Sequence, residues 1–431
     1  MDHVRDGRAE AEPVITADLD SADLAALVTL IRSEAAVTRP ELVAASGLSR
    51  KVVSQRIEQA LATELVAEGG LAPSRGGRQA RTLRFRGDAG FVLGAVIEHG
   101  EIAAASLDLH GDVIALEQAD WPAARGPEQT MRHLQQMLRT AAQRAGGGKP
   151  WAIAVGMPGP VDFSAGRLVH PPLLPEWDGF GPRAWLREQY DCPVWLDNAS
   201  RLMALNAWAA SPPPRADMLF VDVGTGVGAG LVFNGSVIRG ASGGSGVIGH
   251  LRVTDDPAVI CRCGKTGCLE AVASGWKMLD DATARAGESP VLTGILAERG
   301  ALTLPDIGAA AAADDSLVLT MLADAARHIS DVVANLVDFS NPGAVVLGGG
   351  VLHTGPVFLE VLTRTIRDRC SDLALRGLEI RSASLEHHRE AVVGAGLLAI
   401  DSILNPTALS RWIGADGPHA HATELQRLSG A

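Results

Sequence analysis

Two stretches of the chain, residues 91–114 and 219–240, share one order of elements, and this duplication limits the folds available to the chain. The first reads FVLGAVIEHGEIAAASLDLHGDVI and the second LFVDVGTGVGAGLVFNGSVIRG. Each is an apolar run, a tight turn, a second run, a His-Gly or Asn-Gly turn and a third run, which predicts a three-stranded meander. A chain of 431 residues is long enough for two or three domains. We therefore expect two lobes that each begin with a meander.

Two lobes that open in this way resemble the actin, hexokinase and Hsp70 superfamily. The resemblance implies an α/β, ribonuclease H-like fold, in which two turns grip the phosphates of ATP between the lobes. We expect lobe 1 over residues 88–196, completed by about residues 385–405, and lobe 2 over residues 197–384. Residues 406–431 form a C-terminal tail, which is rich in Gly, Ala and His from Gly414 onward and is expected to be disordered.

Charge separates a small basic module from a large acidic body. Residues 21–87 carry ten Lys and Arg against six Asp and Glu, a balance of +4, and residues 1–20 carry two against six, a balance of −4. Since the whole chain has a net charge of −12, the rest of it carries −12. We expect residues 1–20 to form a flexible acidic arm in front of the basic module.

The basic module has the pattern of a helix-turn-helix. Residues 21–33 read as a helix with Leu24, Leu27, Val28 and Ile31 on one face. Thr38 and Glu41 make a capping box for a second, short helix that stops at Gly47. Ser49 caps a third helix, whose start would enter the major groove of DNA. Residues 67–85 then read as two strands around a Gly/Pro/Ser loop, which is the wing of a winged helix-turn-helix.

The predicted DNA-binding residues can all donate hydrogen bonds to phosphates or base edges. In the helices they are Arg39, Ser49, Arg50, Lys51, Ser54 and Gln55, and in the wing Arg75 and Arg78, which suit the minor groove. The alternative is a small three-helix bundle whose basic face is merely solvated. The combination of capping box, turn glycine, exposed donors and basic wing favours DNA binding.

Three of the five cysteines lie within eight residues, in the stretch CRCGKTGC at 261–268. The first twenty residues lack the apolar segment of a signal peptide, and no apolar run reaches the roughly 20 residues needed to span a bilayer. We therefore expect a cytoplasmic protein. In a reducing compartment, clustered cysteines indicate a metal site more often than a disulfide.

The chain resembles the ROK family of repressors and sugar kinases in several motifs along most of its length. These are GTGVGAG, NGSVIRG, IGH, CRCGKTGCLE, PGPVD, LPEW, NPGAVVLGGGV and GAGLLAID. The resemblance implies a structural zinc ion held by His250, Cys261, Cys263 and Cys268. A Cys3His set is a closed tetrahedral site without an open position for catalysis. The alternative is a cluster of reduced cysteines without metal.

Four positions depart from the pattern of the family's kinases. Asn198 stands where they have the catalytic aspartate, and an amide cannot act as a base. Val96 replaces the aspartate of the first phosphate turn, where Glu98 would also repel a phosphate. Val247 and Leu173 replace a glutamate and an asparagine that bind sugar hydroxyls. We predict a structural role for the GTGVGAG turn in preference to ATP binding.

The sequence therefore predicts a ROK-type transcriptional regulator, and in particular a repressor without enzyme activity. A homodimer or homotetramer would bind a palindromic operator in double-stranded DNA. The body would sense a sugar-like effector through Asp197, Asn198, His250 and Glu270, or answer to a protein partner. Two alternatives stay open: a sugar kinase fused to a DNA-binding module, with Asp197 as its base, and a constitutive DNA-binding protein whose body only dimerises.

Overall fold

The structure is a computed structural model that describes residues 19–73, 79–172, 174–212, 216–383, 387–414 and 417–429. The chain forms two compact units. The first contains the described residues up to Arg86 together with Ile403–His421, and the second contains Gly87–Ser402 and the segment from Ala422 onward. In the described ranges, no single helix is both long and apolar enough to cross a membrane.

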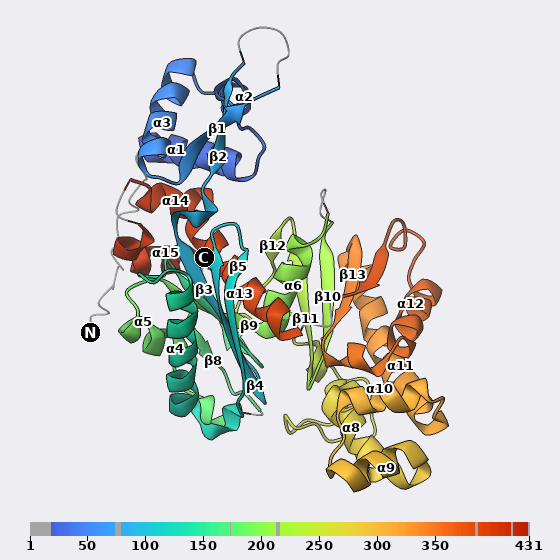
Figure 1. Ribbon diagram of the computed structural model, residues 1–431. Helices are drawn as coiled ribbons and strands as arrows, with labels where there is room; N and C mark the ends of the chain where they lie inside the picture. The colour runs from blue at the N-terminus through green and yellow to red at the C-terminus, as the bar shows by residue number, and fades with distance from the viewer. Residues whose placement is uncertain are drawn as a thin grey trace, which may run out of the picture. The chain divides into compact units, whose positions relative to one another are not determined.

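The first unit begins with the three helices and the hairpin that the sequence predicted (Figure 1). They are α1 (Leu19–Arg32), α2 (Arg39–Ser46), α3 (Arg50–Ala62), β1 (Val66–Leu71) and β2 (Arg81–Phe85). The strands pair antiparallel, from Val66 opposite Phe85 to Leu71 opposite Arg81. The predicted apolar face of α1 is buried, with Leu27 fully so. This apolar face holds the three helices together.

Local hydrogen bonds fix the turn between α2 and α3. The Thr38 hydroxyl accepts a hydrogen bond from the backbone N–H of Glu41, and the Glu41 carboxylate accepts one from the N–H of Thr38 at 3.0 Å. Gly47 ends α2 with a φ of 70°, in the left-handed region that favours glycine. The Ser49 hydroxyl accepts from the N–H of Val52 and caps α3. The predicted capping box and both helix boundaries are thus confirmed.

The prediction of a disordered tail from Gly414 is wrong. The chain contains α14 (Pro406–Trp412), a 3-10 turn at Pro418–His421 and α15 (Ala422–Ser429). Helix α14 packs on α1 in the first unit, and α15 packs on a strand of the second. Ala422 is 8% exposed and Leu425 is fully buried, so a few apolar side chains order a segment whose composition suggests disorder.

The second unit contains two five-stranded sheets of the same topology. The first has the order β5-β4-β3-β6-β9 and the second has the order β12-β11-β10-β13-β14. In each, three antiparallel strands are followed by two strands that run parallel to the first of the three. The duplicated meander predicted from the sequence is confirmed, and it forms three of the five strands of each sheet.

The strand bounds follow the sequence pattern. In lobe 1 they are β3 (Phe91–Ile97), β4 (Glu101–Asp108), β5 (Val113–Asp120), β6 (Ile153–Met157) and β9 (Val194–Asn198). In lobe 2 they are β10 (Met218–Val223), β11 (Val227–Phe233), β12 (Ser236–Val237), β13 (Ala344–Gly348) and β14 (Glu379–Ser382). Strand β3 is buried along its whole length, as expected for a central strand covered on both faces.

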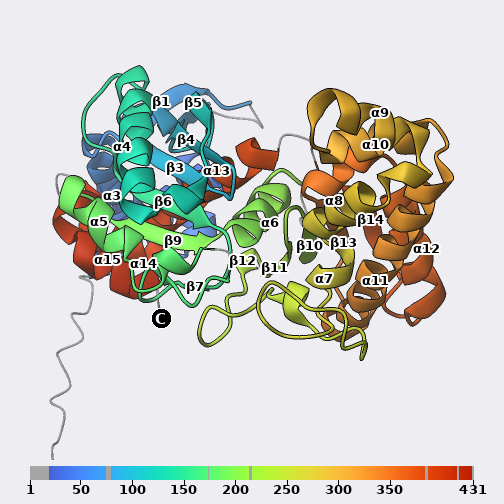
Figure 2. The same ribbon diagram turned by 90° about the horizontal axis from the view of Figure 1, so that it is seen from below.

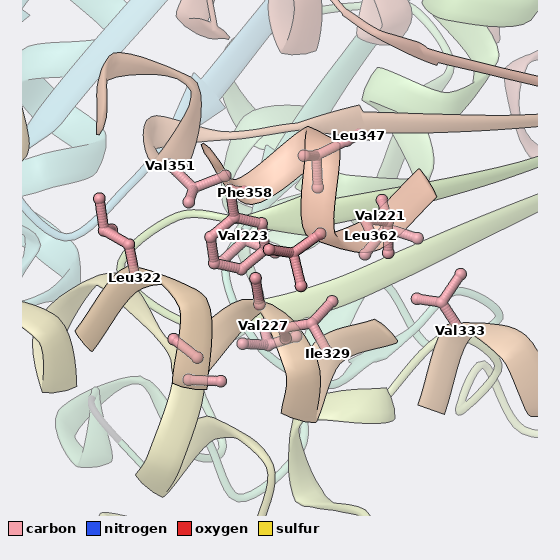
Figure 3. Close-up of a cluster of buried hydrophobic side chains, with 14 of the residues drawn as sticks. Val221, Val223, Val227, Leu322, Ile329, Val333, Leu347, Val351, Phe358 and Leu362 are labelled. Carbon is pink, nitrogen blue, oxygen red and sulfur yellow. The ribbon is translucent and has the colours of Figure 1, made fainter. Parts of the chain in front are cut away.

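Helices cover these sheets (Figures 1 and 2). In lobe 1, α4 (Pro127–Arg144) packs on β3, β4 and β5. In lobe 2, α6 (Ala199–Ala209) packs on β10 and β11, while α11 (Ser316–Ser340) and α12 (Val357–Arg369) pack on one another. Figure 3 shows the apolar core of this lobe, in which Phe358 and Ile329 meet valines of β10 and β11.

The remaining elements complete the second unit, and several of them contribute to the site. They are β7 (Val161–Asp162), β8 (Arg167–Leu168), α5 (Pro182–Gln189), α7 (Glu270–Ala273), α8 (Gly275–Ala284), α9 (Pro290–Arg299), α10 (Leu304–Ala312) and α13 (His387–Leu404). Helix α13 approaches lobe 1 closely, since a Cβ on Gly94 of β3 would lie 2.4 Å from the carbonyl oxygen of Val392. The end of the chain thus returns to lobe 1.

Candidate functional site

Helix α3 exposes polar side chains that were predicted from the sequence to contact DNA. Arg50, Lys51, Ser54 and Gln55 are all exposed in its first half. In the described part of the chain, none of these four side chains has a hydrogen bond or ion pair. Arg56 on the same helix is instead buried and pairs with Asp20 and Gln59. The helix therefore separates a buried structural arginine from an accessible face of donors.

The other predicted DNA contacts are placed differently. The Arg39 guanidinium donates to Glu58 at 2.9 Å and lies 3.7 Å from Glu68 of β1, so acidic partners already hold it. The hydroxyl of Ser49 caps α3, which leaves its own hydrogen available to donate. Arg75 and Arg78 lie outside the described residues.

His250 and the three clustered cysteines form a compact donor set. Their ligand atoms all lie within 4.8 Å of one another. The Nδ1 of His250 is 3.8 Å from the Sγ of Cys261, and the sulfurs of Cys263 and Cys268 are 3.8 Å apart. Three thiols and an imidazole at these separations fit one tetrahedral metal ion of the zinc type. The predicted ligands are thus brought together, and the set can hold a metal.

Glycines and short bridges shape this loop. Gly264 and Gly267 have φ values of 84° and 75°, and a Cβ on Gly267 would lie 2.0 Å from the carbonyl oxygen of Thr254. Single antiparallel bridges join Ile260 to Thr266 and Arg252 to Cys268. Burial raises the pKa of the Cys261 thiol to about 12, because a buried thiolate is poorly solvated. A cation in the cluster would favour the thiolate.

A cavity lies between the two lobes of the second unit, and it contains most of the predicted ligand-binding residues. Asn198, His250 and Glu270 line it, whereas Asp197 does not. Its further lining comes from the β3–β4 turn, the proline-rich loops after β6 and β8, the start of α6, the β10–β11 turn and the loop before His250. Examples are Glu98, Pro158, Pro171, Ser200, Thr225 and Val247.

Asp197 is a buried partner of two arginines. It is fully buried, and its two carboxylate oxygens accept hydrogen bonds from Arg201 Nε at 2.6 Å and Arg239 Nε at 2.8 Å. Arg201 also donates from Nη1 to the carbonyl oxygens of Gly243 and Ser245. The aspartate therefore anchors the loop that follows β12 to the end of β9. The sequence had placed Asp197 among the ligand-binding candidates, and the structure places its oxygens away from the cavity.

Arg201 and Arg239 were missed by the sequence analysis. The i, i+4 spacing of Asp197 and Arg201 at the start of a helix is a signal for an ion pair, although it does not reveal burial. Arg239 had no such signal, because it comes from 42 residues further along the chain. Its guanidinium also lies 4.0 Å from the ring centroid of Phe163. The three charged groups tie together segments from both lobes.

Packing accounts for three glycines of the GTGVGAG turn. A Cβ on Gly228 would lie 2.4 Å from the Ser200 hydroxyl, and one on Gly230 would lie 2.4 Å from the Cβ of Ala204. A Cβ on Gly226 would lie 2.7 Å from Oε2 of Glu270, which also accepts a hydrogen bond from the N–H of Val227. Close approach of this turn and of β11 to α6 and α7 thus gives these glycines a packing role without any phosphate.

The turn between β3 and β4 has few groups that could bind a phosphate. It presents Glu98 and His99 to the cavity. Burial, followed by the nearby charge of Arg262, holds the pKa of His99 below its usual value, so this imidazole stays neutral at neutral pH. A neutral histidine beside a carboxylate gives no positive charge to offset a triphosphate. Two further positions were predicted to differ from the pattern of the family's kinases. Val247 is 38% exposed in the cavity wall, and Leu173 lies outside the described residues.

Residues 95–402 match the model of the ROK family. A xylose repressor of Caldicellulosiruptor bescii is 27% identical over 375 residues, which cover 86% of this chain and 93% of that protein. A glucokinase of Halalkalibacterium halodurans is 33% identical over 249 residues, 57% of this chain and 75% of that enzyme.

A solved structure of a ROK family transcriptional regulator, a homologue of the E. coli MLC protein, has the same fold. It superimposes with a TM-score of 0.76 at 21% identity, over 92% of this chain and 99% of that chain. The repressor match and this structure both extend over more than four fifths of the chain, whereas the glucokinase match covers little more than half. The family model alone spans more than two thirds of the sequence, and the chain belongs to the ROK family.

Proposed function

We propose that this protein is a sequence-specific DNA-binding transcriptional regulator, and in particular a repressor of sugar or carbon metabolism genes. Residues 21–87 form its winged helix-turn-helix, and Arg50 and the other exposed donors of α3 contact the operator. The observation that carries the proposal is the exposed face of Arg50, Lys51, Ser54 and Gln55, whose side chains lack partners in the described chain. The likeness to a xylose repressor over most of the chain supports it.

The body serves as the sensor and dimerisation platform, and the protein acts in the cytoplasm as a homodimer or homotetramer on a palindromic operator. A small effector in the cavity shifts the arrangement of the lobes, and with it operator affinity, by a coupling free energy of about 1–3 kcal/mol. The Cys3His set binds a structural zinc ion. His250, Cys261, Cys263 and Cys268 would hold the ion, and their coordination would brace the loop that leads from His250 to Glu270, both of which line the cavity.

The second candidate is a sugar kinase fused to the DNA-binding module, which the likeness to a glucokinase favours. The base that the sequence offers for this reaction is Asp197, since Asn198 holds the kinase position. Because both oxygens of Asp197 are held by buried arginine contacts, this carboxylate is not available to a substrate hydroxyl. We therefore infer that the body lacks kinase activity. Sugar-dependent ATP turnover that disappears in Asp197→Ala would contradict this.

The experiment that tests the DNA-binding proposal is sequencing of the genomic fragments that the full chain retains, followed by binding of the recovered motif. Arg50→Ala and Lys51→Ala should each lose operator binding while keeping the oligomeric state. Arg132→Ala on α4 removes an arginine whose side chain is 61% exposed, and it should bind as the original does. Absence of any enriched motif, or unchanged binding by both α3 variants, would overturn the proposal.

A further inference from the structure

Much of the cavity wall cannot pair with sugar hydroxyls. The loops of lobe 1 contribute Pro158, Pro160, Pro171, Pro172 and Leu174. From lobe 2, Val247 adds an apolar side chain that is 38% exposed. A hydroxyl that leaves water for contact with these groups loses its hydrogen bonds without replacement, which is unfavourable. An apolar group in the same place is stabilised by leaving water.

The polar groups at the start of α6 are already engaged within the chain. Asn198 donates from Nδ2 to the carbonyl oxygen of Gly159 at 2.9 Å and accepts from the N–H of Arg201 through Oδ1. The Ser200 hydroxyl donates to Asp222 at 2.7 Å. Arg201 is 2% exposed and is held by Asp197 and by two backbone carbonyls. Three polar side chains near the start of α6 thus already have hydrogen-bond partners within the chain, and each is held in place by them.

A few polar groups remain for a ligand. Within the described ranges, the hydroxyls of Thr225 and Ser245 have no hydrogen-bond partner, and only one oxygen of Glu270 is bonded, to the N–H of Val227. Both hydroxyls and the carboxylate lie in lobe 2. Cavities that combine a small number of polar groups with apolar walls bind ligands that have both a polar and an apolar part.

We propose that the cavity binds a sugar derivative with an apolar substituent, an alkyl or aryl glycoside, in preference to a free sugar. Its sugar ring meets Thr225, Ser245 and Glu270, and its substituent lies against the prolines, Leu174 and Val247. This inference rests on the proposed function only in treating the cavity as the effector site. Binding of the glycoside itself needs no DNA.

The test measures dissociation constants of the full, metal-loaded chain by calorimetry for matched pairs of compounds. The pairs are the phenyl and methyl β-glycosides of glucose, galactose, xylose and N-acetylglucosamine, with the four free sugars beside them. For at least one sugar, the phenyl glycoside should bind about tenfold or more tightly than the methyl glycoside, and the free sugar should bind most weakly. A free sugar that binds as tightly as its phenyl glycoside, or no binding by any compound, overturns the proposal.

A substitution at Val247 tests the assignment of the wall. Val247→Glu places a carboxylate where the substituent lies, so it should weaken the phenyl glycoside at least about tenfold and narrow the difference from the free sugar. Val247→Asn, which is close to valine in size, provides the same test if the glutamate variant fails to fold. Ile114→Glu is the matched control, because Ile114 is an exposed apolar residue on β5 outside the cavity lining, at 46%. Equal loss in the control would contradict the assignment.

Operator binding by the same preparation separates the two proposals. If the chain binds its operator but none of the glycosides, the DNA-binding proposal holds and the ligand assignment is wrong. A chain that binds the phenyl glycoside but no DNA has the opposite failure. Release of the operator by the phenyl glycoside, at concentrations near its dissociation constant, supports both.

Discussion

Helix α3 and the cavity between the lobes of the second unit use the same kinds of polar side chain in opposite ways. On α3, Arg50, Lys51, Ser54 and Gln55 are exposed and have no partner in the described chain. In the cavity wall, Asn198, Ser200 and Arg201 are engaged by neighbouring groups of the chain itself. The first arrangement leaves hydrogen-bonding capacity for another molecule. The second uses that capacity to hold two lobes and a loop in place.

This difference decides what a substitution does. Removal of a side chain that has no partner in the chain should change binding and leave stability unaltered. Removal of one that is buried and paired should lower stability, because its partner is left without a compensating group. The cysteine cluster is the extreme of the second kind, and α3 is the clearest case of the first.

The largest effect is expected at the cysteine cluster. Cys263→Ala removes one of four donors, so the zinc content of the purified chain should fall from about one ion to well below one. The melting temperature should fall by roughly 10 °C or more, since a structural metal site contributes directly to folding. Metal analysis and thermal unfolding check both. Cys370→Ala is the control, because Cys370 is a buried thiol outside the cluster, at 9% exposure. A stable, zinc-free Cys263→Ala chain would contradict the structural role.

Asp197 gives the next largest effect. Asp197→Asn keeps the size of the side chain but leaves Arg201 and Arg239 without their common carboxylate, at a cost of about 3–5 kcal/mol in the free energy of unfolding. Urea unfolding of the second unit measures this change. Asp191→Asn is the matched control, because its ion pair with Lys149 is exposed and should contribute less than about 1 kcal/mol. Equal stability of the two variants would mean that the buried network contributes little.

Helices, strands and turns were predictable from the sequence where a local pattern determines them. The capping box of Thr38 and Glu41, the left-handed Gly47 and the repeated meanders each leave a short-range signal, and the structure confirms them. The cluster of His250 and three cysteines was also predictable, since three of its four residues fall in one short loop.

The hydrogen bonds that hold the polar side chains of the cavity wall were not predictable, because they join segments that are distant in the sequence. Arg239 reaches Asp197 from 42 residues away, and nothing in its neighbourhood in the sequence indicates that partner. The tail was mispredicted for a related reason. Leu425 and Trp412 are too few to alter its composition, yet tertiary packing buries both.

For the exposed side chains of α3, we expect a substitution to change operator binding and not stability. Gln55→Ala removes an exposed amide that has no partner in the described chain, so the melting temperature should stay within experimental error. If this amide reads a base edge, operator affinity should fall by about 1–3 kcal/mol, and the preference at one operator position should relax. Binding to a set of operators with single base changes measures both. A uniform loss across all of them would assign Gln55 to the phosphate backbone instead.

The smallest expected effect tests a polar group of the first unit that has partners within the chain. Thr38 is 5% exposed, caps α2 and pairs across a bridge with Thr82. Thr38→Ala removes only the cap hydroxyl and the side-chain methyl, and should lower the free energy of unfolding of the first unit by about 1 kcal/mol. Thermal unfolding followed by hydrogen exchange of α2 amides measures this locally. Saturating operator binding should be preserved, because the exposed face of α3 is unchanged. If a fully folded Thr38→Ala chain lost operator binding, Thr38 would contact DNA. The distinction between side chains paired within the chain and side chains available to DNA would then fail in this unit.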